Sequence, residues 1–142
     1  MASARRRALA LLAGAVLAAC GPATGPQPIA FDREACAHCR MLISEPSFSA
    51  QLQAEDGSFA SFDDPGCLLA HGAAREPGAR LWFHHLRDER WMPGERTAFE
   101  VVSNTPMGYG LGAVDAGTPG ALSLDAARAH VARRAGGAEG TR

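Results

Sequence analysis

The sequence predicts an α+β fold in which two small related modules of the ββα(β) type pack about a pseudo-two-fold axis. Three observations support this prediction: polar and apolar residues alternate around a turn dipeptide, a capped helix start follows, and the same order of signals returns about 60 residues later. The modules are expected over residues 36–75 and 80–135. The 142-residue chain is long enough for one small domain with a modest core.

The first module begins with a predicted hairpin. Residues 49–54 and 58–62 alternate in polarity on either side of Asp56-Gly57, a strong signal for a two-residue turn between strands. One aspartate of the pair at 63–64 can cap a helix whose first position is Pro65. The expected order is strand, strand, helix.

The second module has the same expected order after two further strands. These strands are predicted over 79–86 and 95–102, and the segment between them contains proline and glycine as breakers. Residues 110–114 and 120–124 are then predicted to form a hairpin around a glycine turn. A helix through residue 134, capped by Asp125, completes the module.

The spacing of these signals indicates an internal duplication. Gly57 and Gly117 lie 60 positions apart, and in the same alignment Met41 corresponds to Met107. Packing of the modules about a two-fold axis would bring the two thioethers together beside Cys39. The alternative is that each methionine fills the core of its own module.

Residues 1–19 have the layout of an export signal, with three arginines, a short apolar run and small residues before a cysteine. The run is too short to cross a bilayer, which takes roughly 20 apolar residues. "VLAAC" resembles the lipobox of bacterial lipoproteins, so Cys20 is the expected lipidation site; the alternative is an ordinary signal peptide. The protein is then expected to be exported and lipid-anchored to the cell envelope, facing the periplasm or the cell exterior.

The rest of the chain divides by composition. Residues 20–28 contain the lipidated cysteine and a Gly- and Pro-rich stretch that predicts a flexible linker. The folded domain is expected over 29–135, and residues 136–142 have too little apolar content to pack, which predicts a disordered tail.

The charge balance and the motifs argue against some classes of function. The chain has 14 basic and 15 acidic residues, and removal of the signal takes away three arginines and no acids, leaving 11 minus 15, a net charge of −4. This balance gives no support to a nucleic-acid partner. No nucleophile-elbow, phosphate-loop or metal-hydrolase pattern occurs, so we expect no enzyme.

The cysteine count favours a metal site. Apart from the lipidation site, three cysteines remain, Cys36, Cys39 and Cys67, and an odd number cannot pair fully within one molecule. A thiol-disulfide oxidoreductase would place its Cys-x-x-Cys at a helix start after a strand. No strand is predicted before "CAHCRM" at 36–41, so this alternative is less favoured.

Zinc is a second candidate. Cys36, Cys39, Cys67 and His71 form Cys-x2-Cys followed by Cys-x3-His, a tetrahedral set with its last two ligands on one predicted helix. The structural alternative is that Cys67 is a small buried apolar residue and His71 faces solvent.

Cu(I) accounts for the methionines as well. Cu(I) prefers thiolate and thioether ligands, whereas the carboxylates typical of Mg or Ca sites are absent from the motif. In an extended segment Cys39 and Met41, two positions apart, point to the same face, so both sulfurs can reach one ion. Cys36 or Met107 can complete a trigonal site, and His38 can serve transiently.

"CAHCRM", "FDDPGCLL" and "NTPMGYGL", followed by a Gly-rich turn and a short terminal helix, together resemble the NosL family, the lipoproteins that accompany nitrous oxide reductase. The resemblance covers most of the chain from Ile29 to Val131. It implies an exported Cu(I)-binding metallochaperone, folded as two related modules, that delivers copper to the apo-reductase or its assembly machinery. The ligands implied are Cys39 and Met41, with Cys36 and Met107 as further candidates. Cys67 and His38 are additional candidates from the residues themselves, not from the resemblance.

Two positions depart from the family pattern. Arg40 stands where glycine is frequent, and Cys67 lies where many members have no cysteine. These departures leave the copper-receiving partner open, and a copper oxidase is an alternative to the reductase.

Overall fold

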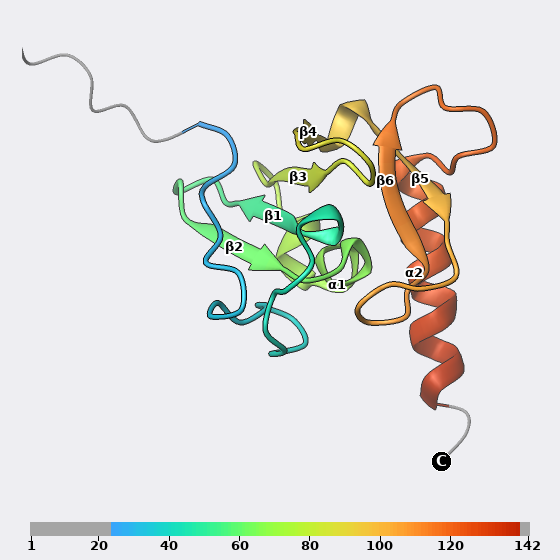
Figure 1. The fold of residues 1–142 in the computed structure, drawn as a ribbon, viewed down its shortest axis with the longest axis horizontal. Helices are drawn as coiled ribbons and strands as arrows, with labels where there is room; N and C mark the ends of the chain where they lie inside the picture. The colour runs from blue at the N-terminus through green and yellow to red at the C-terminus, as the bar shows by residue number, and fades with distance from the viewer. Residues whose placement is uncertain (1–23, 140–142) are drawn as a thin grey trace, which may run out of the picture.

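The computed structural model describes residues 24–139 and shows a mixed α+β fold (Figure 1). The predicted signal segment and the lipidation site at Cys20 lie outside the described residues. In chain order the elements are η1 (Pro46–Phe48), β1 (Ala50–Gln53), β2 (Phe59–Phe62), α1 (Pro65–Ala70), η2 (Gly72–Arg75), β3 (Arg80–His84), β4 (Trp91–Pro93), η3 (Gly94–Arg96), β5 (Thr97–Val101), β6 (Leu111–Asp115) and α2 (Leu124–Glu139). The predicted α+β class is confirmed.

The strands form two antiparallel sheets. One has four strands in the order β2-β1-β3-β4, and the other pairs β5 with β6. Helix α1 packs against β1, β2, β6 and α2, so it lies where the two sheets meet, while α2 runs beside the β5–β6 pair (Figure 1). This arrangement places the N-terminus of α1 within reach of loops from both halves.

The first hairpin forms as predicted. Its turn is stabilised by Asp56, whose Oδ1 accepts hydrogen bonds from the backbone N–H of Ser58 (2.9 Å) and from its hydroxyl (2.6 Å). Gly57 has φ +85°, a left-handed conformation that glycine adopts without strain. Both strands fall within the predicted ranges.

The second predicted hairpin is wrong. The segments 110–114 and 120–124 do not pair with each other, because β5 lies between them: Phe99 is paired with Ala113 on one side and bridged to Leu122 on the other. The reason is the connection after β6. Two successive turns, closed onto Asp115 and Thr118, carry the chain across to the far edge of β5.

A proline-containing strand was missed between the two halves. The segment with proline and glycine was predicted as a break, yet Trp91–Pro93 forms β4 and pairs with β3. Proline is tolerated there because β4 is an edge strand. Strand β3 in turn pairs with β1, so the four-stranded sheet extends across the predicted boundary between residues 75 and 80.

The ordered chain begins earlier than the predicted domain start. The backbone N–H of Gln27 donates to Oε1 of Gln51 (2.7 Å), and Nε2 of Gln51 donates back to the carbonyl of Gln27 (3.0 Å). Gln51 is buried on β1. The end of the predicted linker is therefore fixed to the sheet.

Helix α2 is longer than predicted at both ends. It starts at Leu124 because the hydroxyl of Ser123, not the carboxylate of Asp125, accepts the capping hydrogen bond, here from the N–H of Ala126 (3.2 Å). The helix runs through Glu139, so it includes residues that were assigned to the tail. No helix among the described residues combines the length and apolarity needed to span a bilayer.

Apolar packing joins the two sheets. Phe83 of β3 and Phe99 of β5 are fully buried, and their rings meet edge to face with centroids 4.9 Å apart. The backbone N–H of Leu86 also donates to the carbonyl of Ala113 on β6 (2.7 Å). These contacts make one continuous core of the two halves.

Polar contacts cover the same junction. The ring of His85 is buried and accepts a hydrogen bond from the backbone N–H of Arg87 (3.2 Å). Arg87 pairs with Glu100 of β5, and Arg90 pairs with Asp115 at the end of β6 (2.5 Å). Exposed ion pairs contribute little to stability, so the apolar contacts dominate the junction.

Truncation of Phe99 should therefore be strongly destabilising. We expect Phe99→Ala to lower the free energy of unfolding by about 3–5 kcal/mol, since it removes a fully buried ring from the junction. Urea unfolding measures this change. Val101→Ala on the same strand is the matched control, because Val101 is 61% exposed and should change stability by less than about 0.5 kcal/mol. Equal losses in both variants would contradict the proposed junction.

Candidate metal centre

The segment "CAHCRM" forms a tight loop. The N–H of Cys36 donates to the carbonyl of Met41 (2.8 Å), and the N–H of Arg40 donates to the carbonyl of Cys36 (3.1 Å). An isolated bridge between Ala35 and Leu42 closes the loop at its base. The prediction that Cys39 and Met41 share one face of an extended ribbon is therefore wrong, because the backbone turns between them.

Arg40 enables this turn. Its φ is +69°, in the left-handed region that favours glycine. A non-glycine residue there costs about 1 kcal/mol.

The loop is fixed against the end of β2. The N–H of Ala37 donates to the carbonyl of Ser61 (2.9 Å), and the N–H of Ser44 donates to Oδ1 of the buried Asp63 (3.1 Å). Cys36 becomes fully buried at this contact. The loop thereby presents its thiols to the first turn of α1.

Helix α1 contributes the third thiol. Asp64 is the N-cap, with Oδ1 accepting from the N–H of Gly66 (2.7 Å), and Pro65 occupies the first helical position, as the sequence predicted. Cys67 follows within the first turn and is fully buried. The cap therefore fixes where Cys67 meets the loop.

Three cysteines converge at this contact. The Sγ atoms of Cys36, Cys39 and Cys67 all lie within 4.8 Å of one another, and none of the three is in a disulfide. Cys36 and Cys67 are buried, whereas Cys39 is half-buried. The cluster can hold a metal ion, and Cys39 gives it an accessible side.

The thiols differ in acidity. The thiol of Cys67 donates to the sulfur of Cys36 and lowers the pKa of Cys36 to about 4, with help from nearby backbone amides. The same hydrogen bond, together with burial, raises the pKa of Cys67. Burial also raises the pKa of Cys39. Cys36 is therefore the most acidic of the three thiols, and metal binding through all three sulfurs would release protons.

His71 does not join the thiols. His71 is the C-cap of α1, and its backbone N–H donates to the carbonyl of Cys67 (3.1 Å), so it follows Cys67 by one turn as predicted, but its ring does not turn toward the thiols. Its ring packs edge-on against Phe62, with centroids 5.3 Å apart, and lies 6.1 Å from the ring of His38. Among the His, Cys, Asp and Glu side chains that the structure describes, only the three cysteines form a candidate metal cluster.

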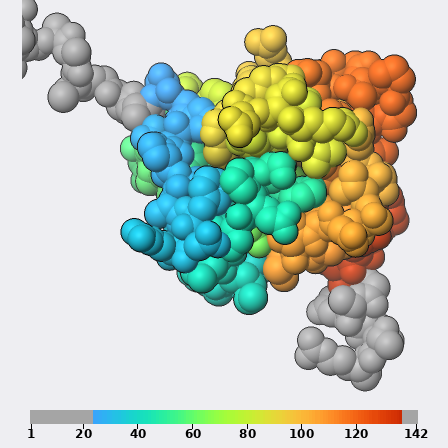
Figure 2. Space-filling model, viewed as in Figure 1, coloured from blue at the N-terminus to red at the C-terminus, as the bar shows by residue number. Residues whose placement is uncertain are grey.

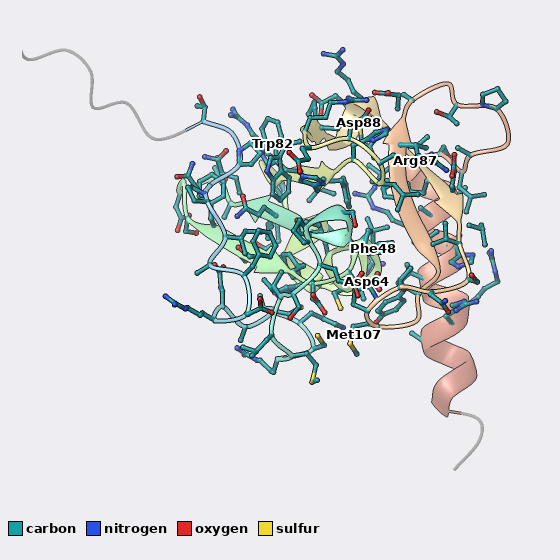
Figure 3. All side chains as sticks on the ribbon, viewed as in Figure 1. Phe48, Asp64, Trp82, Arg87, Asp88 and Met107 are labelled. Carbon is teal, nitrogen blue, oxygen red and sulfur yellow. The ribbon has the colours of Figure 1, made fainter. Side chains whose placement is uncertain are left out.

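The loop before β6 reaches α1 from the other half of the molecule. The backbone N–H of Met107 donates to Oδ2 of Asp64 (3.0 Å). From α2, Nε2 of His130 hydrogen-bonds the carbonyl of Tyr109 (2.9 Å), and Arg134 donates to the carbonyl of Gly108. Figure 3 shows sulfur atoms near the labelled Met107 and Asp64.

Neither methionine of the predicted pair fills a core. The side chain of Met41 is 59% exposed and that of Met107 is 39% exposed. In Figure 2 the segment before η1 and the segment before β6 reach the same lower edge of the molecule. The alternative that each methionine packs inside its own module is therefore wrong.

Tyr109 is a neighbour of the site that sequence reasoning missed. Its ring packs against Gly66, where an added methyl group would collide with Cβ and Cγ of Tyr109. Burial raises the pKa of Tyr109, and the neighbouring carboxylate of Asp64 raises it further. The "NTPMGYGL" motif contained this residue, but no local pattern showed that it would lie over α1.

Comparisons with known proteins give little guidance on function. No protein-family model matches the chain, and no solved structure matches it. Stromelysin-1 of Rattus norvegicus is 32% identical over 114 residues, which is 75% of this chain. The matched region covers only 23% of stromelysin-1, less than a quarter of its length.

The hydrogen bond between two thiols predicts a measurable titration. Cys67→Ala removes the donor and should raise the pKa of Cys36, as measured by the ultraviolet thiolate absorbance of the metal-free protein against pH. The Cys36 thiolate stabilises the fold fully above the ordinary thiol pKa near 9, and this contribution is lost as the pH falls through about 4. Cys67→Ser keeps a hydroxyl donor and should keep the low value. An unchanged midpoint in Cys67→Ala would contradict this assignment.

The contact between Gly66 and Tyr109 can be tested separately. Gly66→Ala should lower the free energy of unfolding by about 1–3 kcal/mol, because the methyl group overlaps the tyrosine. Tyr109 is the only tyrosine in the chain, so its NMR resonance reports displacement of the loop directly. Gly72→Ala has free space around the added methyl group and is the control. An unmoved tyrosine resonance in Gly66→Ala would be incompatible with this packing.

Proposed function

We propose that the protein is an exported Cu(I)-binding metallochaperone of the NosL type. One observation carries the proposal: three free thiols meet within 4.8 Å, and one of them, Cys39, is partly accessible. Soft sulfur ligands select Cu(I) over hard cations. The resemblance of "CAHCRM" and "NTPMGYGL" to the NosL family supports the same metal.

The donor set favours Cu(I) over structural zinc. Structural zinc sites are almost always closed by four protein ligands, and the proposed fourth ligand, His71, lies outside the cluster. Cu(I) is satisfied by two or three sulfurs. The proposed ligands are Cys36, Cys39 and Cys67, with thioether donation from Met41 and Met107.

Transfer needs a site that an incoming ligand can enter. The buried Cys36 and Cys67 would bind the ion on its protein side, and the half-buried Cys39 would bind it on the side open to the recipient. Exposed thioethers at Met41 and Met107 suit a stepwise exchange of sulfur ligands, with no covalent chemistry and no enzymatic activity. The proposed recipient is a periplasmic copper enzyme, nitrous oxide reductase or its assembly machinery.

Two further elements complete the proposal. Lipidation of Cys20 would anchor the domain at the cell envelope, consistent with the lipobox-like "VLAAC". We also propose a duplicated origin of the two modules, although the second copy lacks the hairpin expected around Gly117, because Leu122 pairs with β5 instead. Helices α1 and α2 pack together.

Anaerobic titration of the purified full-length protein tests the metal. We expect it to bind about one Cu(I) per chain through a sulfur-only shell, and Cys39→Ser to weaken binding strongly because the accessible thiolate is lost. X-ray absorption at the copper edge identifies the ligand atoms.

His71→Gln separates copper from zinc. This variant should bind Cu(I) as well as the wild type, because the imidazole lies outside the thiol cluster. Stoichiometric zinc in the isolated protein, lost in His71→Gln and needed for folding, would overturn the proposal in favour of the zinc site. A copper shell of nitrogen or oxygen atoms would also overturn it.

A further inference from the structure

The buried carboxylate of Asp64 has two separate roles at one position. Its side chain is fully buried, and each of its oxygens accepts a hydrogen bond from a different part of the chain. Oδ1 caps the helix that carries Cys67 by accepting from Gly66 (2.7 Å), and Oδ2 accepts from the N–H of Met107 (3.0 Å). One side chain thus fixes the distance between the thiol-bearing helix and the methionine-bearing loop.

The two hydrogen bonds join residues that are far apart in sequence. Met107 lies 43 positions after Asp64. The loop between β5 and β6 has no other hydrogen bond to α1 among the described residues. Its other anchors, from His130 and Arg134, attach it to α2 at Tyr109 and Gly108. The carboxylate is therefore the polar contact that fixes the position of Met107 relative to Cys67.

We propose that Asp64 is a positioning residue for the metal site, which holds Met107 beside the three thiols so that its thioether can bind the same ion. The inference rests on the proposed copper function and deepens it. Asp64 is not part of the candidate metal cluster, which consists of the three cysteines, and its two oxygens accept from backbone N–H groups.

An amide replacement separates the two roles. Asparagine caps helices about as well as aspartate, so Asp64→Asn keeps an oxygen for Gly66. The second oxygen becomes an NH₂ group, which cannot accept from Met107. The variant should therefore fold with Cys67 in place and release only the Met107 loop.

Selenium in place of sulfur makes binding of Met107 to copper detectable. In selenomethionine-labelled full-length Met41→Leu protein loaded with Cu(I), we expect X-ray absorption at the copper edge to show copper–selenium scattering from Met107. Asp64→Asn in this background should abolish that scattering while the copper–sulfur shell of the three cysteines remains. Met107→Leu supplies the zero level, because the remaining described methionine, Met92, is buried on β4.

Asp63→Asn is the matched control. Asp63 is the neighbouring buried carboxylate, but it accepts from Ser44 and not from Met107, so this variant should keep the selenium signal. Cu(I) affinity should fall equally in Asp64→Asn and Met107→Leu, and no further in the double variant. Retention of the selenium signal in Asp64→Asn, or its absence in the parent, would overturn the inference. Absence of any copper–sulfur shell in the parent would instead overturn the proposed function.

Discussion

The first turn of α1 is the contact on which the rest of the structure depends. Its capping carboxylate is buried, its second residue must be glycine-sized to admit Tyr109, and its third is Cys67. The CAHCRM loop meets this turn from one half of the molecule and the Met107 loop meets it from the other. A buried charge is tolerated only with full hydrogen bonding, and Asp64 obtains it by drawing the two halves together.

The same contact governs the electrostatics of the metal-free state. Three ionised thiols within 4.8 Å would repel strongly in a buried site, so the cluster shares its protons and carries its charge on Cys36. A bound cation would remove the repulsion and let Cys39 and Cys67 ionise as well. Fold stability and metal binding would then be coupled through one group of atoms.

Local signals in the sequence were sufficient for some elements and insufficient for others. Asp56-Gly57 and Asp64-Pro65 determined the first hairpin and the helix start, because turn and cap chemistry involves neighbours only. The bridge from Phe99 to Leu122 joins distant segments and left no local pattern. Residue type brought Cys36, Cys39 and Cys67 into the candidate set, but the direction of the His71 ring, which packs on Phe62 and does not join the thiols, depended on tertiary packing.

The pair of hydrogen bonds between Gln27 and Gln51 limits how far the folded domain can lie from Cys20. Gln27 lies seven positions after Cys20, and a fully extended chain of seven residues spans only about 25 Å. If Cys20 bears a lipid, Gln27 cannot lie more than about 25 Å from the lipid-bearing residue, so the domain stays close to the membrane surface. Under the proposed function, a copper recipient would then have to lie at or in the membrane to receive the ion.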